Sequence, residues 1–299
     1  MPPLLIAAPA SLSGKTTAAV ALGQRLRDSG RSVALLRLTG DGHAAADARL
    51  FAGLAFNASS RTEPVEAVAV ADEDVTLIEA PAGDPRRAAG PLSARAVVVV
   101  AYADPLPADI PSFCEALGDS CAGVIITRVP GRRLEATRTA AEGVGVRIVA
   151  LVPEDRLLAA PTLGAIAEAL EAETSSLNSA RDNIIDRPII SSISVDPAQA
   201  YFADYNPNAV IVRGDKPDQQ LGALNADVPC LIITGGSPLL SYVEERAQEE
   251  EVTLLKTRYD TVATVQRLEP LYGATPFTGQ AKVERVIQLT ADLDVSALV

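Results

Sequence analysis

The sequence predicts an α/β protein: a parallel sheet covered by helices on both faces, followed by a second, smaller α/β domain. Short β-branched and apolar runs alternate with amphipathic helical segments, which is typical of such sheets. Residues 96–100 are apolar throughout, as in a strand that is buried on both faces. The chain has 299 residues, more than the usual size of one domain.

The alternation of apolar runs with amphipathic helical segments predicts the strands and helices of the first domain. Strands are expected at residues 4–8, 33–38, 75–79, 96–101, 123–127 and 147–151. Helices are expected at residues 111–117, 134–142 and 163–172. A further helix begins at Gly14-Lys15 and ends before Gly30, with Ala18, Leu22 and Leu26 at four-residue spacing on its apolar face.

The predicted domain boundary lies in residues 173–188, where the periodicity is lost and the sequence turns polar. We therefore expect domains at residues 1–178 and 179–299. A second small parallel sheet is expected from the apolar runs 209–212, 230–233 and 252–255, with helices after Pro217, Pro238 and Asp260. The loosely amphipathic stretch from Lys282 to Val299 is expected to pack on its own domain or to pair with a second copy.

Composition excludes several classes of partner. The net charge of −12 disfavours nucleic acid and anionic membranes, so neither is expected as a partner. No apolar run approaches the roughly 20 residues of a membrane span, and the N-terminus lacks the pattern of a signal peptide. A cytoplasmic location is therefore expected. The cysteines Cys114, Cys121 and Cys230 form no CxxC and are expected to be small buried hydrophobes.

The most informative motif is the loop that follows the first predicted strand and ends in Gly14-Lys15-Thr16. A helix that starts there directs its unpaired amides and positive dipole end into the loop, where a polyphosphate can accept hydrogen bonds. Pro9 departs from the strict phosphate-loop pattern, but the strand-loop-helix context favours a phosphate loop over an ordinary helix start. The expected phosphate-binding residues are Ser11, Ser13, Gly14, Lys15, Thr16 and Thr17.

A magnesium site is expected beside this loop. The hydroxyl of Thr16 is placed to ligate Mg²⁺. Glu79 ends a buried strand, where a carboxylate is costly unless it is paired or bound to a metal. Asp41 or Asp47 would supply the third ligand, although a solvated loop is an open alternative for both. The single histidine, His43, is expected to be a surface residue and not a base.

Five stretches together resemble a known superfamily. Residues 7–17 resemble the phosphate loop of cobyrinic acid a,c-diamide synthase and dethiobiotin synthetase, in which a longer loop is normal. The other stretches follow in the order of that superfamily at residues 37–41, 78–83, 123–130 and 152–158. The resemblance implies a P-loop NTPase-type domain that binds ATP, or another nucleotide, together with Mg²⁺. It also implies that Thr127 contacts the nucleotide, because it stands where the family has an asparagine that reads adenine.

Some positions depart from the family pattern. A hydroxyl at Thr127 cannot make the paired contact of an amide. The glycine-rich turn after Glu79 is Ala80-Pro81-Ala82-Gly83, with fewer amides and less backbone freedom on the substrate side, and Leu12 replaces a loop glycine. These changes favour a nucleotide-binding module over a ligase, with at most slow ATPase or ATP-dependent ligase activity.

The second domain resembles the DRTGG domain through Arg213-Gly214-Asp215-Lys216, Ile232-Ile233-Thr234-Gly235-Gly236 and Asp260-Thr261. The amides around the two glycines are expected to face open space, and Ser237 to cap the next helix. A tight turn without a ligand is the open alternative. The candidate effector site consists of Asp215, Lys216, Thr234, Gly235, Gly236 and Ser237.

This pairing of domains resembles the N-terminal regulatory half of long bacterial phosphate acetyltransferases. The chain stops at Val299 without the acyltransferase domain, so that activity is not expected. We expect a regulatory or sensor protein that binds a nucleotide and a small effector, forms a homodimer or higher homo-oligomer, and acts on a metabolic enzyme as partner. The alternatives are an ATP-dependent ligase or amidoligase, and a scaffold with an empty loop.

Overall fold

The computed structural model describes residues 3–66, 73–84, 94–174, 177–191, 199–296 and 298. The chain forms two compact units. The first consists of Met1–Leu158 and Pro276–Val299, and the second of Ala159–Thr275. The second unit is therefore an insertion in the sequence of the first, which differs from the expected order of two consecutive domains.

The first unit contains a parallel sheet with strand order β2-β3-β1-β4-β5-β6. Its strands are β1 (Leu4–Ala7), β2 (Val33–Arg37), β3 (Val75–Glu79), β4 (Arg95–Ala101), β5 (Cys121–Val129) and β6 (Ile148–Pro153). From β1 the chain continues toward one edge of the sheet, and from β4 toward the other. The carboxyl ends of β1 and β4 thus flank a topological switch point, where open α/β sheets bind ligands.

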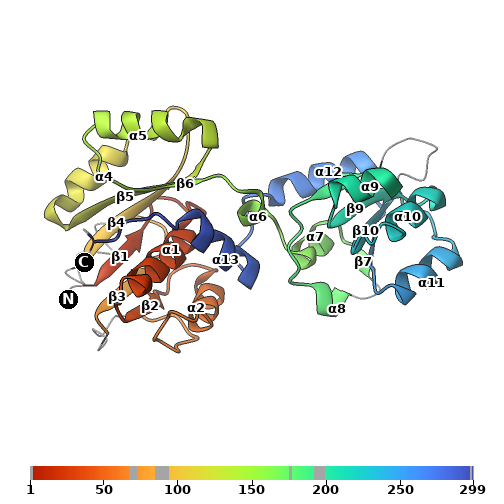
Figure 1. The fold of residues 1–299 in the computed structure, drawn as a ribbon, viewed down its shortest axis with the longest axis horizontal. Coiled ribbons are helices and arrows are strands. Elements are labelled where there is room, and N and C mark those ends of the chain that lie inside the picture. Colours follow the sequence, from red (N-terminus) through yellow and green to blue (C-terminus); the bar gives the residue numbers. More distant parts are fainter. Residues whose placement is uncertain are drawn as a thin grey trace. The chain divides into compact units, whose positions relative to one another are not determined.

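Helices cover both faces of this sheet, which confirms the predicted fold class (Figure 1). The helices are α1 (Lys15–Asp28), α2 (Ala44–Ala52), α4 (Ile110–Leu117), α5 (Leu134–Gly143), α6 (Arg156–Ala159) and α13 (Gln280–Leu289). Along β4, Val97 and Val99 belong to the core beneath α1 and α13, whereas Val98 and Val100 belong to the core beneath α4 and α5. The uninterrupted apolar run of β4 follows from burial on both sides.

The C-terminal helix α13 packs on α1 in the first unit. Val283 and Val286 join the core of that unit, and Arg25 of α1 donates hydrogen bonds to the carbonyl oxygens of Ile287 and Ala291. The expectation that this stretch packs on the second domain is therefore wrong. The apolar side chains of α13 pack against α1. The helical periodicity of the sequence did not indicate which helix would be the partner of α13.

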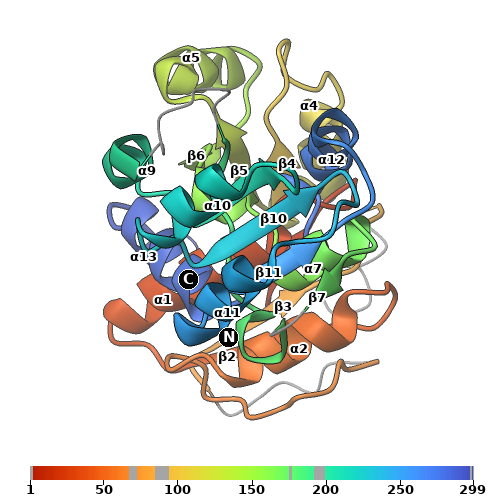
Figure 2. The same cartoon turned by 90° about the vertical axis from the view of Figure 1, so that its right-hand side faces the viewer.

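The second unit has a sheet with strand order β7-β11-β10-β9-β8, in which only β7 is antiparallel. Strands β10, β11 and β7 of this sheet are labelled in Figure 2. Its strands are β7 (Glu173–Thr174), β8 (Pro188–Ile190), β9 (Ala209–Arg213), β10 (Cys230–Thr234) and β11 (Thr253–Lys256). Its helices are α7 (Leu163–Ala169), α8 (Leu177–Ala180), α9 (Gln199–Tyr205), α10 (Pro217–Leu224), α11 (Ser241–Glu249) and α12 (Thr261–Leu268). Helices α9, α10 and α11 cover one face, and α7 and α12 cover the other.

The division between the units falls at Leu158/Ala159, about twenty residues before the expected boundary. Helix α7 belongs to the second unit, because Leu163 and Ile166 share a core with Ile211. The polar stretch 173–188 is no linker: it contributes β7 and α8 and leads into β8. Strands of two or three residues at the sheet edges are too short to carry a recognisable hydrophobic pattern.

Two further expectations concern burial and membranes. Cys230 is buried as expected, but Cys114 and Cys121 are only half-buried, so the expectation was wrong for these two thiols. In the described part of the chain, no helix is both long and apolar enough to cross a membrane.

Candidate functional site

The loop between β1 and α1 has the backbone shape of a phosphate-binding turn. Gly14 is the N-cap of α1 and has φ 87°, in the left-handed region, and no side chain caps the helix. A Cβ atom on Gly14 would lie 2.9 Å from Cγ2 of Thr127. Backbone conformation and close packing both require glycine here. The first amides of α1 consequently have no side-chain acceptor and are available to an anion.

Strand β5 holds this loop from the side. The hydroxyl of Thr127 donates to the carbonyl oxygen of Ser13 at 2.8 Å, and Nη2 of Arg128 donates to the carbonyl oxygen of Leu12 at 2.7 Å. Within the loop, the Ser13 hydroxyl donates to the carbonyl oxygen of Ala10. Thr127 is buried, so in this structure it positions the loop, and its contact with a nucleotide base stays a prediction. Arg128 was not identified from the sequence.

The other expected loop residues differ in exposure. Lys15 is buried, with 7% of its surface exposed. Burial lowers the pKa of its ammonium group, and the nearby Glu79 carboxylate opposes that shift. Ser11 is exposed, and Thr16 and Thr17 are half-buried at the start of α1. The buried cation next to open amides gives this end of the helix strong attraction for a phosphate group.

Glu79, at the end of β3, lies next to the start of α1. The hydroxyl of Thr16 donates to Oε1 of Glu79 at 3.2 Å, while Oε2 has no hydrogen-bond partner although the side chain is only 2% exposed. Burial, together with the charge of Asp47, raises the pKa of Glu79 to about 8. An unpartnered buried carboxylate oxygen is costly and fits an additional ligand, such as a metal ion.

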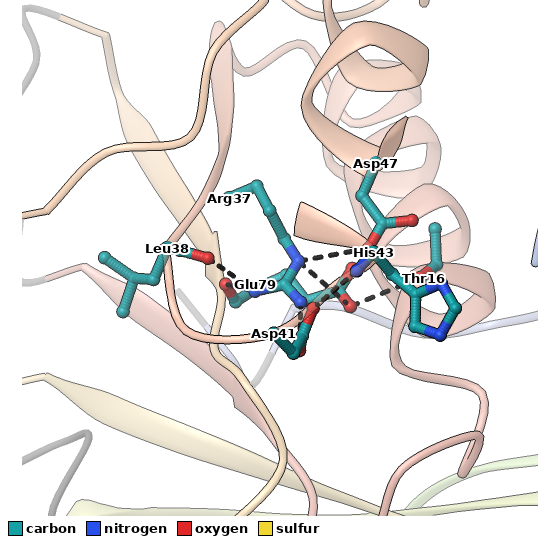
Figure 3. Close-up of polar contacts among 7 residues, drawn as sticks. All are labelled: Thr16, Arg37, Leu38, Asp41, His43, Asp47 and Glu79. Atoms are coloured by element: carbon teal, nitrogen blue, oxygen red, sulfur yellow. Dashed lines mark hydrogen bonds and ion pairs between the residues drawn. The ribbon is translucent and has the colours of Figure 1, made fainter. Parts of the chain in front are cut away.

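The remaining predicted metal ligands surround the guanidinium of Arg37, at the end of β2 (Figure 3). Nε of Arg37 lies 3.1 Å from Asp47 and 3.7 Å from Glu79, and Nη2 lies 2.5 Å from Asp41. Asp47 is buried on α2, so the alternative of a solvated loop does not hold for it. Burial raises the pKa of Asp47. At Asp41 burial acts in the same direction, but the hydrogen bond and charge of Arg37, with the amide of His43, together lower the pKa.

The structure therefore brings the four predicted metal ligands to one place, but with a cation among them. Across the described ranges, no three histidine, cysteine or carboxylate side chains are arranged to hold a metal ion. Sequence reasoning missed Arg37 as a site residue; the available signal was a charged side chain at the end of a wholly buried strand. His43 is exposed beside the cluster and contributes its amide to Asp41, in agreement with the expected surface position.

The candidate effector residues of the second unit also lie together. The amide of Gly214 donates to the carbonyl oxygen of Thr234, which joins the ends of β9 and β10. Asp215 forms an exposed ion pair with Arg213, and Lys216 is the residue before α10. The hydroxyl of Thr234 pairs with that of Thr261 at 3.0 Å.

The Gly-Gly turn in this group is closed by the protein itself. The amide of Gly235 donates to the carbonyl oxygen of Tyr259 at 2.7 Å, and the amide of Gly236 donates to that of Thr257 at 3.1 Å. The expectation that these amides face open space is therefore wrong. Ser237 does not cap a helix either, because α11 begins only at Ser241. The alternative of a tight turn without a ligand agrees better with this geometry.

Residues 165–271 match the family model of the DRTGG domain. Among solved structures, the chain is similar to the CBS and DRTGG domains of the regulatory region of Clostridium perfringens pyrophosphatase, complexed with the activator diadenosine tetraphosphate. The identity is 19% and the TM-score 0.34, over 40% of this chain and 51% of the other. The chain thus spans about half of that regulatory region.

Two further structures contain MinD. The MinC:MinD cell division complex of Aquifex aeolicus is 17% identical with a TM-score of 0.40, over 53% of this chain and 84% of the other. The septum site-determining protein MinD of Pyrococcus horikoshii OT3, complexed with Mg-ADP, is 20% identical with a TM-score of 0.36, over 52% of this chain and 82% of the other. The family match begins within α7 and ends just after α12, so the chain carries a DRTGG domain at residues 165–271, as its motifs predicted.

Proposed function

We propose that this protein binds a nucleoside triphosphate, ATP in the first instance, with Mg²⁺ in its first unit, and that it is a regulatory or sensor protein related to the N-terminal region of phosphate acetyltransferase. The observation that carries the proposal is the uncapped start of α1 behind left-handed Gly14, with Lys15 buried beside it. Open amides, a helix dipole and a desolvated cation attract phosphate together.

Magnesium fits beside these groups. Thr16 and Glu79 would hold the ion, because the Thr16 hydroxyl already contacts Glu79 and the second carboxylate oxygen has no partner. Both are hard oxygen ligands of the kind that Mg²⁺ prefers. The ion would neutralise charge on the phosphate oxygens. Lys15 would bind the outer phosphates, and the loop amides would orient them.

Binding is favoured over ligase chemistry by the turn after β3. The amide of Ala80 donates to Ile6 and that of Gly83 to Ala8, and Pro81 has no amide hydrogen. This turn offers few donors to a second substrate that would accept a phosphoryl group. The ligase alternative predicts ADP release that carboxylate substrates stimulate; we expect no such stimulation.

We assign the binding of a small effector to the DRTGG domain. The bound state would then be transmitted through self-association of the chain or through contact with a metabolic enzyme. Asp215, Lys216 and Thr234 remain the candidate effector residues, since they meet at the carboxyl end of the second sheet. The closed Gly235-Gly236 turn limits this site to side-chain contacts. A homodimer is the simplest expected assembly.

Isothermal titration calorimetry with ATP, in Mg²⁺ and in EDTA, tests the nucleotide proposal. We expect Mg²⁺-dependent binding that Lys15→Ala weakens by about a hundredfold or more, because a buried charge contact is lost. The matched control is Lys256→Ala, which removes an exposed lysine paired with Glu244 in the second unit and should leave the affinity unchanged. Absence of Mg²⁺-dependent heat with ATP, GTP and ADP would overturn the proposal.

A further inference from the structure

Arg37 is the most completely enclosed charge of the phosphate site. Its side chain is 1% exposed, and each of its nitrogens has an acceptor within the protein. Nη1 donates to the carbonyl oxygens of Leu38 and Glu79, at 2.6 and 3.5 Å, in addition to the carboxylate contacts of Nε and Nη2. This guanidinium is therefore fixed by the fold, with contacts to the carboxylates and carbonyl oxygens drawn in Figure 3.

Its position among three carboxylates determines what the site can bind. Without Arg37, the carboxylates of Asp41, Asp47 and Glu79 would form a strongly negative group, of a kind that attracts free divalent cations. With Arg37 between them, Asp41 and Asp47 are directed to the guanidinium. Oε2 of Glu79 is the fully buried carboxylate atom of this group without a hydrogen-bond partner, and within the described residues Oδ1 of Asp47 accepts no hydrogen bond either.

The ligands that remain are too few to bind a free metal ion. Oε2 of Glu79, Oδ1 of Asp47 and the hydroxyl of Thr16 make at most three, whereas Mg²⁺ requires six oxygens in near-octahedral geometry and gives up its waters reluctantly. A polyphosphate on the loop would supply further oxygens and negative charge. The affinity of the site for the metal would then depend on bound nucleotide, and its affinity for the nucleotide on bound metal.

We propose that Arg37 is a resident counter-cation that prevents the site from binding free Mg²⁺, so that the metal binds only together with the polyphosphate. This inference rests on the proposed binding of Mg²⁺-nucleotide. In this role Arg37 is a positioning residue: it orients Asp41, Asp47 and Glu79 and contacts no nucleotide. A direct role in phosphate binding makes a different prediction, because loss of the guanidinium would then weaken nucleotide binding without creating metal binding.

The test measures metal binding in the absence of nucleotide. Free Mn²⁺ is titrated against the full chain and followed by electron paramagnetic resonance, with Mg²⁺ as competitor. We expect weak or no binding by the natural protein. Arg37→Met should bind Mn²⁺ about tenfold more tightly or better, because a unit charge a few ångströms from the metal has been removed. Inorganic triphosphate should restore tight Mn²⁺ binding to the natural protein.

Two control variants separate the loss of the positive charge at position 37 from the loss of an arginine elsewhere. Arg49→Met removes an exposed arginine from α2 and should not change Mn²⁺ binding. Arg37→Lys keeps the positive charge and should also exclude free Mn²⁺. If Arg37→Met unfolds, Mn²⁺ should restore its far-ultraviolet circular dichroism, and failure to do so contradicts the proposal.

The inference and the proposed function fail in different ways. Tight binding of free Mn²⁺ by the natural protein overturns the inference even if Mg²⁺-ATP binds. A folded Arg37→Met that gains no Mn²⁺ affinity overturns it as well. If neither free Mn²⁺ nor Mg²⁺-ATP binds to the natural protein, the proposed function itself fails.

Discussion

The two units bury different kinds of polar side chain. Within the described residues, the buried charged side chains all belong to the first unit: Lys15, Arg37, Asp47, Glu79 and Lys282. The buried polar side chains of the second unit are glutamines and threonines. Burying a charge is costly unless it is paired, whereas an amide or hydroxyl needs only a hydrogen bond.

The carboxyl ends of the two sheets show the same difference. In the first unit the start of α1 has no side-chain cap, and an oxygen of Glu79 has no partner. In the second unit, Asp260 caps α12, and the amides of Gly235 and Gly236 are bonded to the next loop. The amides of Gly235 and Gly236 therefore need no ligand, and the buried oxygen without a partner near the end of β9 is an amide oxygen, Oε1 of Gln220. In the first unit it is a carboxylate oxygen, which is more costly to leave without a partner.

The largest expected effect comes from removing a buried cation. Arg37→Met should lower the free energy of unfolding of the first unit by about 3 to 5 kcal/mol, because it leaves carboxylates in the interior without their partner. Arg213→Met, which breaks the exposed pair with Asp215, should produce no measurable change. Hydrogen exchange followed by mass spectrometry, with peptides from each unit, measures the change in unfolding free energy that each of the two substitutions causes. Equal effects of the two substitutions would contradict the distinction between the units.

The next effect depends on pH and concerns Lys282 of α13. Burial lowers the pKa of its ammonium group from 10.5 to about 8. Between these values the unfolded chain binds more protons than the folded one, so this residue makes stability rise with pH over that range. Lys282→Met should therefore stabilise the first unit by about 3 kcal/mol at pH 7.

This gain should be largely lost as the pH approaches 10.5, because the folded chain is then neutral at this position and only about half of the unfolded molecules carry the charge. Denaturant unfolding of the natural protein and Lys282→Met across pH 7 to 10.5 measures it. Lys256→Met, at an ion pair with Glu244 in the second unit, serves as the control for replacing a lysine by methionine. A constant gain for Lys282→Met would indicate a packing effect and not titration.

Sequence patterns predicted the architecture well where strands are long and apolar. Every strand expected in the first unit is present, and the both-face burial of β4 follows from its composition. The short edge strands β7 and β8 and the placement of α13 were not predicted, because edge strands lack a hydrophobic repeat and an amphipathic helix does not specify its partner.

The site was predicted in part for a related reason. Thr16 and Glu79 could be paired from the sequence because the carboxyl ends of parallel strands meet at one edge of a sheet. The buried position of Arg37 was signalled by its place at the end of an apolar strand, but its contact with β3 was not, because Arg37 and Glu79 are 42 residues apart in the sequence. The closure of the Gly235-Gly236 turn by the 257–259 loop was missed for the same reason.

The smallest expected effect is a difference in stability between alanine substitutions at two glycines that share a backbone conformation. Gly14 and Gly235 have φ 87° and 91°, so alanine at either position costs about 1 kcal/mol of strain. Only at Gly14 would the added Cβ meet a neighbour, Thr127, at 2.9 Å; at Gly235 nothing lies within 4 Å. Gly14→Ala should therefore destabilise its unit by about 1 to 3 kcal/mol more than Gly235→Ala does, through overpacking.

The same clash would displace the loop carbonyl that accepts from Thr127, so Gly14→Ala should also weaken binding of Mg²⁺-ATP, while Gly235→Ala leaves it unchanged. Thermal unfolding and calorimetry on both variants check the two effects. Gly14→Ala combined with Thr127→Ser, which removes the Cγ2 methyl group and keeps the hydroxyl, should recover much of the lost stability. If the double variant is no more stable than Gly14→Ala, close packing against β5 does not hold the phosphate loop in place.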